Sequence, residues 1–356
     1  MISNATKIDA HRNARGGLKS GGRVALRRIG RALGGAVAIC LLIAGGAGAD
    51  QANRLRVGAL KFGTVNWELD VVQSHGLATR EGVDLEVVPL ASKSATNVAV
   101  QGGAVDLIVS DWIWVSRQRA EGRRYTFVPY SLTVGALMVR PDAGVREISD
   151  LRGKRLGIAG GPVDKSWLLM RAYSQRKIGE DLADIVEPSF VAPPLLNQLM
   201  LRGELPAGLN FWHYGARLKA AGMHELIQVT DVLTALGVNQ PVPLLGWVFN
   251  EDWAASHREL VNGFLRASYA AKRILTESDA EWLRLRPIMK VKDDTTLYAL
   301  RDAYRAGVPR RFGAAETDAA RRVFEVLATV GGDELVGSSR SLSDGTFWNG
   351  FEMAPW

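Results

Sequence analysis

Cysteine is almost absent from this sequence. Its 356 residues contain one, Cys40, so residues 50–356 hold no thiol nucleophile, no cysteine ligand for zinc or an iron–sulfur cluster, and no disulfide. A chain without these cross-links depends on its hydrophobic core. With 47% hydrophobic residues, it is long enough to form two domains of ordinary size.

An excess of charge is also absent from most of the chain. Eight of the 44 basic residues and one of the 37 acidic residues precede residue 50, which leaves 36 of each sign after it. The net charge of +7 therefore belongs to the N-terminal segment. A nucleic-acid-binding domain needs clustered positive charge in its folded part, so we expect no nucleic-acid partner.

The sequence lacks the common catalytic motifs. It has no G-x-S-x-G element, and Gly153-Lys154 lacks the upstream glycine of a phosphate-binding loop. His224-Glu225 begins like a zinc-binding helix, but Gln228 stands where the second histidine would be. The other histidines after residue 49 have no recognisable partner in the sequence: His75, His213 and His257. We therefore predict a protein that is not an enzyme and has no cofactor and no metal site.

The first 49 residues have the pattern of an export signal. A basic stretch precedes the uncharged run Ala32–Ala44, and Ala47-Gly48-Ala49 follows it. This pattern predicts a secretory signal peptide over 1–49 and a periplasmic protein. A membrane anchor is the alternative, but the apolar run is shorter than the roughly 20 residues that a span needs. Export by the twin-arginine route at Arg27-Arg28 and lipidation of Cys40 are minor alternatives. We expect no membrane insertion after cleavage, and a monomer.

From residue 55 onward, short apolar runs alternate with amphipathic stretches. Strands are expected at Leu55–Leu60, Val83–Leu90 and Val105–Ser110, with a helix after each. Near-continuous apolar strands joined by helices are typical of an α/β fold with parallel or mixed sheets covered on both faces. Tyr125–Tyr130 and Gly135–Val139 are expected to extend this first unit.

A second series of alternating apolar runs and amphipathic stretches follows, and the chain then returns to the first unit. A second strand–helix series begins at Lys154–Ala159, and after a strand at Leu244–Asn250 the chain becomes mainly helical. We predict a bilobal protein in which 50–137 and 244–356 form lobe one and 138–243 form lobe two. Two chain crossings, near Leu132–Arg140 and Pro241–Val248, would form a hinge.

Polar and aromatic residues follow the expected strands. In open α/β sheets, ligands bind beyond the carboxyl ends of the strands, where helix N-termini attract oxygen-rich or anionic groups. The residues predicted to bind a ligand on this basis are Asn66, Trp67, Ser94, Thr96, Ser110, Asp111, Trp112, Gly160, Gly161, Asp164, Ser166, Trp212 and Tyr214.

Each of these residues has a purely structural alternative. Ser94, Thr96 and Asp164 could act only as helix caps, and tryptophans could belong to the core. Four tryptophans nevertheless follow strand ends, which favours a ligand cleft with aromatic walls; they are Trp67, Trp112, Trp167 and Trp212.

Charged residues near these positions leave the ligand open. Lys93 and Lys165 favour a carboxylate or sulfonate group, whereas Asp111, Asp164 and Glu68 favour an amine or a ring N–H. A sulfonate, a zwitterion or a heteroaromatic molecule is compatible with these charges.

Three segments carry a resemblance to a known family. They are Leu55–Gly58, the run Gly102–Asp106 before a strand, and Asp150-Leu151-Arg152-Gly153-Lys154-Arg155-Leu156-Gly157-Ile158 at the entry to lobe two. With these segments the chain resembles the nitrate/taurine/sulfonate group of ABC-importer binding proteins, whose wider family includes binders of thiamine-pyrimidine precursors. The resemblance implies a type II periplasmic binding protein fold, hinge closure on a small organic ligand, and delivery to a membrane permease and its ATPase.

Two other functions remain open at this point. A receptor that reports ligand occupancy to a membrane sensor or periplasmic enzyme would use the same hinge closure. Relatives of this fold also synthesise a pyrimidine, but that iron-dependent chemistry is associated with a cysteine-rich motif, and residues 50–356 contain no cysteine.

Overall fold

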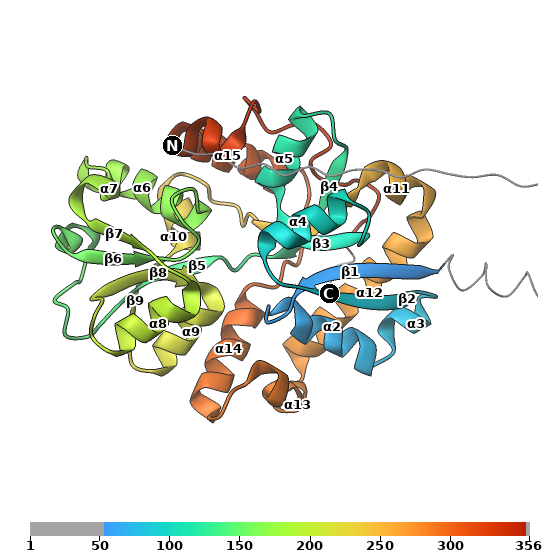
Figure 1. Cartoon of the computed structure of the whole chain (residues 1–356), viewed down its shortest axis with the longest axis horizontal. Coiled ribbons are helices and arrows are strands. Elements are labelled where there is room, and N and C mark those ends of the chain that lie inside the picture. The colour runs from blue at the N-terminus through green and yellow to red at the C-terminus, as the bar shows by residue number, and fades with distance from the viewer. Residues whose placement is uncertain (1–52, 354–356) are drawn as a thin grey trace, which may run out of the picture. The chain divides into compact units, whose positions relative to one another are not determined.

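The computed structural model describes residues 53–353. The predicted signal peptide, 1–49, lies outside the described residues. The strands form two five-stranded sheets, with the orders β2-β1-β3-β10-β4 and β7-β6-β8-β5-β9. The two sheets are shown in Figure 1 with the helices that cover them. Each sheet with its helices is one lobe, and both are mixed, because β10 and β5 run antiparallel to their neighbours.

Lobe one contains the first sheet. Its strands are β1 (Arg54–Leu60), β2 (Asp84–Leu90), β3 (Leu107–Asp111), β4 (Tyr125–Ser131) and β10 (Leu245–Asn250). Its helices up to the first crossing are α2 (Val65–Ser74), α3 (Leu77–Arg80), α4 (Lys93–Gln101) and α5 (Trp112–Ala120). After β10 come α11 (Glu251–Ser256), α12 (Arg258–Glu277), α13 (Asp279–Met289), α14 (Asp294–Ala306) and α15 (Ala314–Val336).

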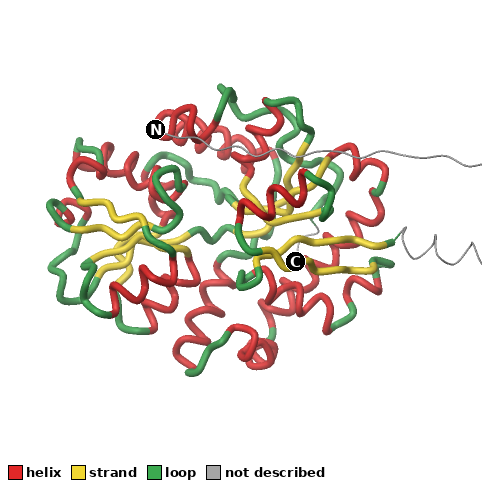
Figure 2. The backbone as a smooth tube through the Cα atoms, viewed as in Figure 1, coloured by secondary structure: helices red, strands yellow, loops and turns green. Residues whose placement is uncertain are grey.

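Lobe two contains the second sheet. Its strands are β5 (Gly135–Val139), β6 (Arg155–Ile158), β7 (Glu187–Phe190), β8 (Ala207–Phe211) and β9 (His224–Gln228). A short 3₁₀ helix at Ile148–Leu151 precedes β6. The helices are α6 (Lys165–Ile178), α7 (Leu182–Ile185), α8 (Pro193–Leu201), α9 (Trp212–Ala220) and α10 (Val229–Ala235). Figure 2 shows the alternation of strand and helix that the sequence predicts for both lobes.

One expected strand belongs to the other sheet. Gly135–Val139 was expected to extend the first unit, but β5 pairs with β8 and β9 in the second sheet, so that expectation is wrong. The boundary predicted between residues 137 and 138 falls inside β5. The reason is a very short crossing: β4 ends at Ser131 and only residues 132–134 separate it from β5. The pattern of apolar and amphipathic segments cannot show that the chain changes from one sheet to the other across so few residues.

The hydrophobic cores connect the lobes. One buried cluster includes Trp112 and Ile113 of α5, Leu168 and Leu169 of α6, and Phe324 of α15. Helix α15 packs against both α5 and α6, so it links the lobes although it follows the last strand. Among residues 53–353, no helix has the length and apolar character needed to cross a membrane.

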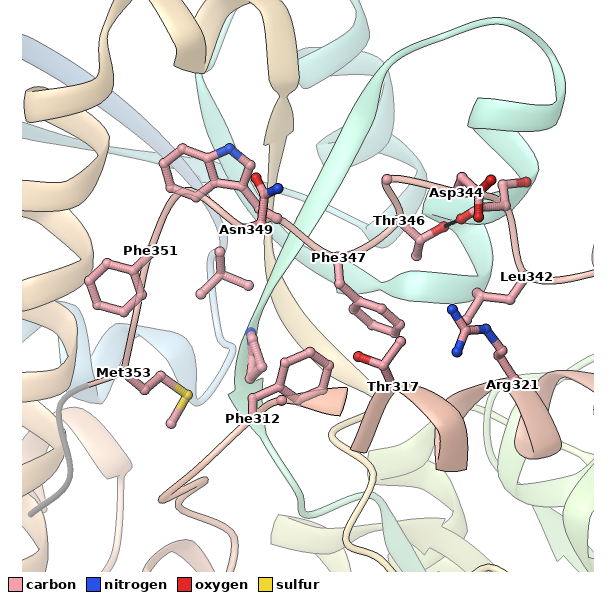
Figure 3. Close-up of a pocket in the computed structure, with 16 residues that line it drawn as sticks. Phe312, Thr317, Arg321, Leu342, Asp344, Thr346, Phe347, Asn349, Phe351 and Met353 are labelled. Carbon is pink, nitrogen blue, oxygen red and sulfur yellow. Dashed lines mark hydrogen bonds between the residues drawn. The ribbon is translucent and has the colours of Figure 1, made fainter. Parts of the chain in front are cut away.

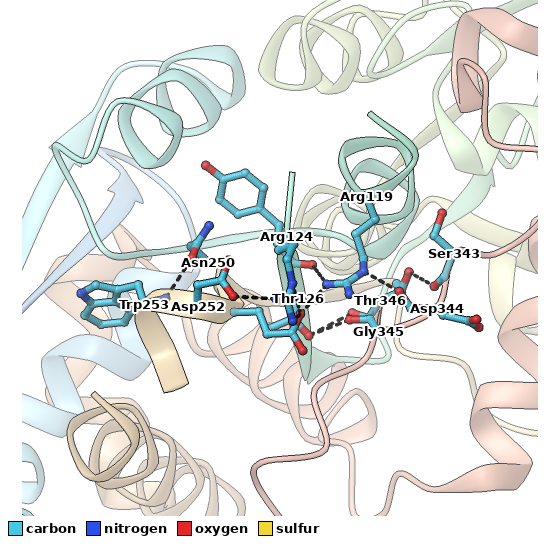
Figure 4. Close-up of polar contacts among 12 residues, drawn as sticks. Arg119, Arg124, Thr126, Asn250, Asp252, Trp253, Ser343, Asp344, Gly345 and Thr346 are labelled. Atoms are coloured by element: carbon cyan, nitrogen blue, oxygen red, sulfur yellow. Dashed lines mark hydrogen bonds and ion pairs between the residues drawn. The ribbon is translucent and has the colours of Figure 1, made fainter. Parts of the chain in front are cut away.

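The chain after α15 lies along the edge of the first sheet. Residues Phe127 and Phe347 form a parallel bridge, and the amide of Trp348 donates to the carbonyl of Phe127 at 2.9 Å. Arg119 donates to the carbonyl of Asp344, and Thr126 Oγ1 donates to that of Gly345 at 3.0 Å (Figure 4). These contacts partly cover the edge strand β4, which would otherwise expose unpaired backbone groups.

Candidate functional site

The carboxyl ends of the parallel strands bring charged residues of both lobes together. Asp111 is the last residue of β3 and the N-cap of α5, where its Oδ1 accepts from the amide of Trp114 at 2.9 Å. Lys93 begins α4 in lobe one, and Lys165 begins α6 in lobe two. Both ammonium groups donate to Oδ2 of Asp111, at 2.8 Å from Lys93 and 3.0 Å from Lys165. We call these three residues the interlobe charge cluster.

The charge cluster is partly accessible. The side chain of Asp111 is 4% exposed, whereas those of Lys165 and Lys93 are 21% and 54% exposed. Burial alone raises the pKa of Asp111, but the positive charges of Lys165 and Lys93 and hydrogen bonds outweigh it and hold this pKa far below its ordinary value. The negative charge of Asp111 raises the pKa of Lys93. Two ammonium groups thus share the Asp111 carboxylate, and the negative charge of Asp164 also acts on both of them, so the cluster offers positive and negative groups to a ligand.

The loop between β6 and α6 places Lys165. Gly160 and Gly161 both have φ of 93°, a conformation that residues with a Cβ rarely adopt. After them Asp164 caps α6, with Oδ1 accepting from the amide of Ser166 at 2.9 Å. Burial raises the pKa of Asp164 and, separately, lowers that of Lys165. The turn therefore directs the start of α6 toward lobe one.

Several predicted site residues have structural partners. Asn66 donates to the carbonyls of Leu60 and Gly63, at 2.8 and 2.9 Å, and so fixes the loop after β1. Thr96 is buried and donates to the carbonyl of Lys93 at 2.8 Å, whereas Ser94 is exposed and Ser92 is the N-cap of α4. Ser166 is buried at the start of α6.

The predicted aromatic walls are mostly buried. Trp67, Trp112 and Trp167 are 5%, 0% and 2% exposed. The indole of Trp112 donates to the carbonyl of Pro243 at 3.0 Å, which ties α5 to the second crossing. Trp212 and Tyr214, at the start of α9, are half-buried. Ligand contact by these residues stays a prediction, and in this closed arrangement they pack largely against protein.

Two aromatic residues that the sequence reasoning passed over are exposed at strand ends. Phe62 follows β1 and is 77% exposed, with the ammonium groups of Lys61 and Lys290 at 5.7 and 4.7 Å from its ring centre. Phe190 ends β7, is 41% exposed and contacts Trp167. The signal that selected the tryptophans, an aromatic residue just past a strand, also identifies Phe62, whereas Phe190 is the last residue of its strand.

Two residues considered for the site have other environments. Glu68 was interpreted as a possible partner of a ligand amine, but it is fully buried and paired with Lys272 in lobe one. Ser110 is buried beside Asp111, and its Oγ has no hydrogen-bond partner among the described residues. The histidines do not gather: His75 pairs with Glu281 at 3.2 Å, and burial, with the charge of Arg217, lowers the pKa of His213 to about 3.

The cavities found in the described part of the chain lie away from the charge cluster. One of about 400 Å³ is enclosed by the C-terminal segment, the start of α15 and β4 (Figure 3), and none of the predicted site residues lines it. Another, of about 760 Å³, lies between the two crossings, α9, α10 and α14, and Trp212 lines it. The residues of the charge cluster line neither of these two cavities.

Comparison with known proteins identifies the family. Residues 71–280 match the family model described as NMT1/THI5 like. The chain belongs to this NMT1/THI5-like family. The predicted resemblance, to the group that contains nitrate, taurine, sulfonate and thiamine-pyrimidine precursor binders, is thereby confirmed. A comparison with curated protein sequences gives no match.

Solved structures show that this NMT1/THI5-like chain has the fold of periplasmic binding proteins. The periplasmic aliphatic sulphonate-binding protein SsuA from Escherichia coli is 16% identical, with a TM-score of 0.66 over 85% of this chain and 94% of that one. The alkanesulfonate-binding protein SsuA from Xanthomonas axonopodis pv. citri, bound to MOPS, is 16% identical, with a TM-score of 0.64 over 83% and 98%.

The same fold also serves an enzyme. The desulfurization enzyme DSZB is 15% identical to this chain, with a TM-score of 0.55 over 78% of this chain and 92% of that one. The fold predicted for this NMT1/THI5-like protein, with two mixed sheets in two lobes, is confirmed by these likenesses. Fold alone does not assign a ligand.

Proposed function

We propose that this protein is the solute-binding component of an ABC-type importer in the periplasm, and that it captures a small organic anion between its two lobes. The observation that carries the proposal is the charge cluster, in which Lys93 of lobe one and Lys165 of lobe two converge on Asp111. Cationic side chains from opposite lobes can bind one anionic group only when the lobes close, so such a ligand would favour closure.

Exposed aromatic side chains at strand ends favour an organic acid over a bare inorganic anion. Phe62 and Phe190, at strand ends of lobes one and two, offer exposed apolar surface, which suits a ligand with an apolar body beside its sulfonate or carboxylate. Helices α4 and α6 begin at Lys93 and Lys165, and helix N-termini attract negative charge. A zwitterion could also use the carboxylate of Asp111.

The proposal also assigns a hinge between the lobes and the partners that receive the ligand. We assign the hinge to residues 132–134 and to the segment around Pro241–Leu244, where the chain passes between the sheets. The ligand-loaded protein would deliver its ligand to a membrane permease and its ATPase. The charge cluster offers ammonium groups and the ionised carboxylate of Asp111, which can bind charged groups of a ligand.

A thermal-shift measurement with matched ligands tests this function. The panel is taurine, MOPS, hexanesulfonate, hexanoate and hexylamine, each with the full chain. A ligand present at 100 times its dissociation constant adds roughly 2.7 kcal/mol to stability. We expect hexanesulfonate or MOPS to raise the melting temperature and hexylamine to leave it unchanged. The assignment of an anionic ligand would be overturned if hexylamine alone stabilised the protein, or if none of the five compounds did.

A further inference from the structure

An aromatic contact joins the two lobes on the side of α9. Trp212 of lobe two meets Trp67 of α2 edge to face, with ring centres 5.9 Å apart at 84°, and Tyr304 of α14 at 6.4 Å. Trp282 of α13 contacts Trp67 at 6.2 Å and Tyr304 at 5.2 Å. We call Trp67, Trp212, Trp282 and Tyr304 the aromatic joint. Three of its rings belong to lobe one, and Trp212 is the lobe-two member.

The lobe-one side of the joint is fixed by buried hydrogen bonds. The hydroxyl of Tyr304 donates to Glu68 at 2.9 Å, and the same carboxylate pairs with the buried ammonium of Lys272. The indole of Trp282, which is fully buried, donates to the carbonyl of Leu275 at 2.8 Å. Because these partners hold the rings in place, the joint is a preformed socket for the indole of Trp212.

The lobe-two side is fixed as well. The backbone amide of Trp212 donates to the carbonyl of Val134, next to the first crossing, at 3.1 Å. One and a half turns later in α9, Arg217 donates to the carbonyl of Met289 at the end of α13, at 2.9 Å. Helix α9 thus contacts lobe one through the Trp212 indole and the Arg217 side chain, and α9 and α14 pack against each other.

The joint and the charge cluster depend on the same movement. Trp212 follows β8 and Lys165 follows β6, and these strands are neighbours in the second sheet. Since both residues belong to one lobe, opening the hinge would withdraw Trp212 from its socket and Lys165 from Asp111 together. The joint contains little that would recognise a ligand: its lobe-one rings are buried, and the Tyr304 hydroxyl is already used.

From this arrangement we propose that Trp212 is a positioning residue for ligand binding. Its insertion among Trp67, Trp282 and Tyr304 holds the lobes closed and brings Lys165 to Lys93 and Asp111. The ligand then binds a partly preorganised cluster. The effect of Trp212 on affinity rests on the proposed function.

Distance measurements between spin labels test the joint without any ligand. Labels attached to Arg202→Cys in lobe two and Arg258→Cys in lobe one, both exposed, report the separation of the lobes. The full chain would carry Cys40→Ser, which removes its one native cysteine. We expect Trp212→Ala to lengthen and broaden the distance distribution of the ligand-free protein. Trp212→Phe should restore much of the short distance.

Trp253→Ala is the matched control. Trp253 is half-buried in lobe one, where it stacks on His257, so this substitution removes an indole that lies outside the joint. A distribution for Trp212→Ala that matches the Trp253→Ala control would overturn the proposal. If Trp212→Ala does not fold, Trp212→Leu replaces it, with the same expectation and the same contradicting result.

A binding measurement separates this proposal from the proposed function. If hexanesulfonate binds, Trp212→Ala should weaken it about tenfold, because apparent affinity falls with the fraction of closed protein, and saturating hexanesulfonate should restore the short distance. An unchanged affinity would overturn the positioning role. If no anion binds the unmodified chain, the proposed function fails, while the ligand-free distances still decide whether the joint holds the lobes.

Discussion

The ammonium of Lys165 lies 3.0 Å from Oδ2 of Asp111, and this ion pair connects the two lobes. The two residues are 54 positions apart in sequence; Asp111 ends β3 of one sheet, and Lys165 follows β6 of the other. Lys93 reaches the same oxygen from within lobe one. A single carboxylate therefore holds both ammonium groups where a ligand anion would meet them.

The first prediction concerns Lys165. Lys165→Met should weaken binding of hexanesulfonate at least about tenfold, because removing one partner of a buried charge pair costs about 2–5 kcal/mol. Lys177→Met is the control, since this exposed lysine lies on the same helix. Isothermal titration calorimetry measures both. Equal affinities for the two variants would show that Lys165 does not contact the ligand.

The strands were largely predictable from sequence. Apolar runs such as Val105–Ser110 place β3 to within two residues, and Asp111, at the end of that strand, meets Lys165 of the other lobe. The roles of individual side chains were less predictable. Trp112 follows a strand as Trp212 does, yet it is fully buried because Pro243, 131 residues away, accepts its N–H.

Long-range pairing explains the remaining differences. Glu68 was interpreted as favouring a ligand amine or ring N–H, but Lys272, 204 residues later, pairs with it. Short helices such as α7 and α10 were not expected, because segments of four to seven residues carry too little periodicity to be distinguished from loops. Contacts of this kind depend on the packing of α12 and α14 on the sheet, which spacing does not encode.

The second prediction is a pH dependence of stability that belongs to Asp111. Its pKa in the folded protein lies far below the ordinary 3.8, so the stabilisation is present above that value and is lost as the pH falls below it. The difference in free energy of unfolding between the native chain and Asp111→Asn should therefore shrink from pH 5 toward pH 3. Urea denaturation at several pH values measures it.

The control for this experiment is Asp231→Asn, a substitution at an exposed aspartate of α10. Its effect should be small at every pH. If the difference between the native chain and Asp111→Asn stays constant from pH 7 to pH 3, the ion pairs of Asp111 do not contribute to stability as the geometry indicates.

The third prediction concerns the buried pair Glu68–Lys272, whose side chains are 0% and 1% exposed. Lys272→Met should destabilise the protein by about 3–5 kcal/mol, because it leaves a buried carboxylate without its counter-charge. Adding Glu68→Gln should recover more than half of that loss, since the amide oxygen can still accept from Ser268 and the amide nitrogen can donate to the hydroxyl oxygen of Tyr304. Urea unfolding compares the three proteins. A loss below 1 kcal/mol for Lys272→Met would contradict this account.

The fourth prediction compares two neighbouring glycines that share a φ of 93°. Alanine at either position is strained by this backbone conformation, at a cost of about 1–2 kcal/mol. At Gly160 the new Cβ would also lie 2.5 Å from Oδ2 of Asp164, whereas at Gly161 it would meet nothing within 4 Å. Gly161→Ala is therefore a control for backbone strain alone.

Gly160→Ala should displace Asp164 from the amides that it caps and so shift the start of α6, where Lys165 is located. Both variants should lose stability, but only Gly160→Ala should also lose affinity for hexanesulfonate beyond a few-fold. The two substitutions are at adjacent positions and have the same backbone cost. A larger loss of affinity in Gly160→Ala would therefore be due to a shift in the position of Lys165. Parallel losses of affinity in the two variants would instead mean that the turn as a whole, and not the cap at Asp164, determines binding.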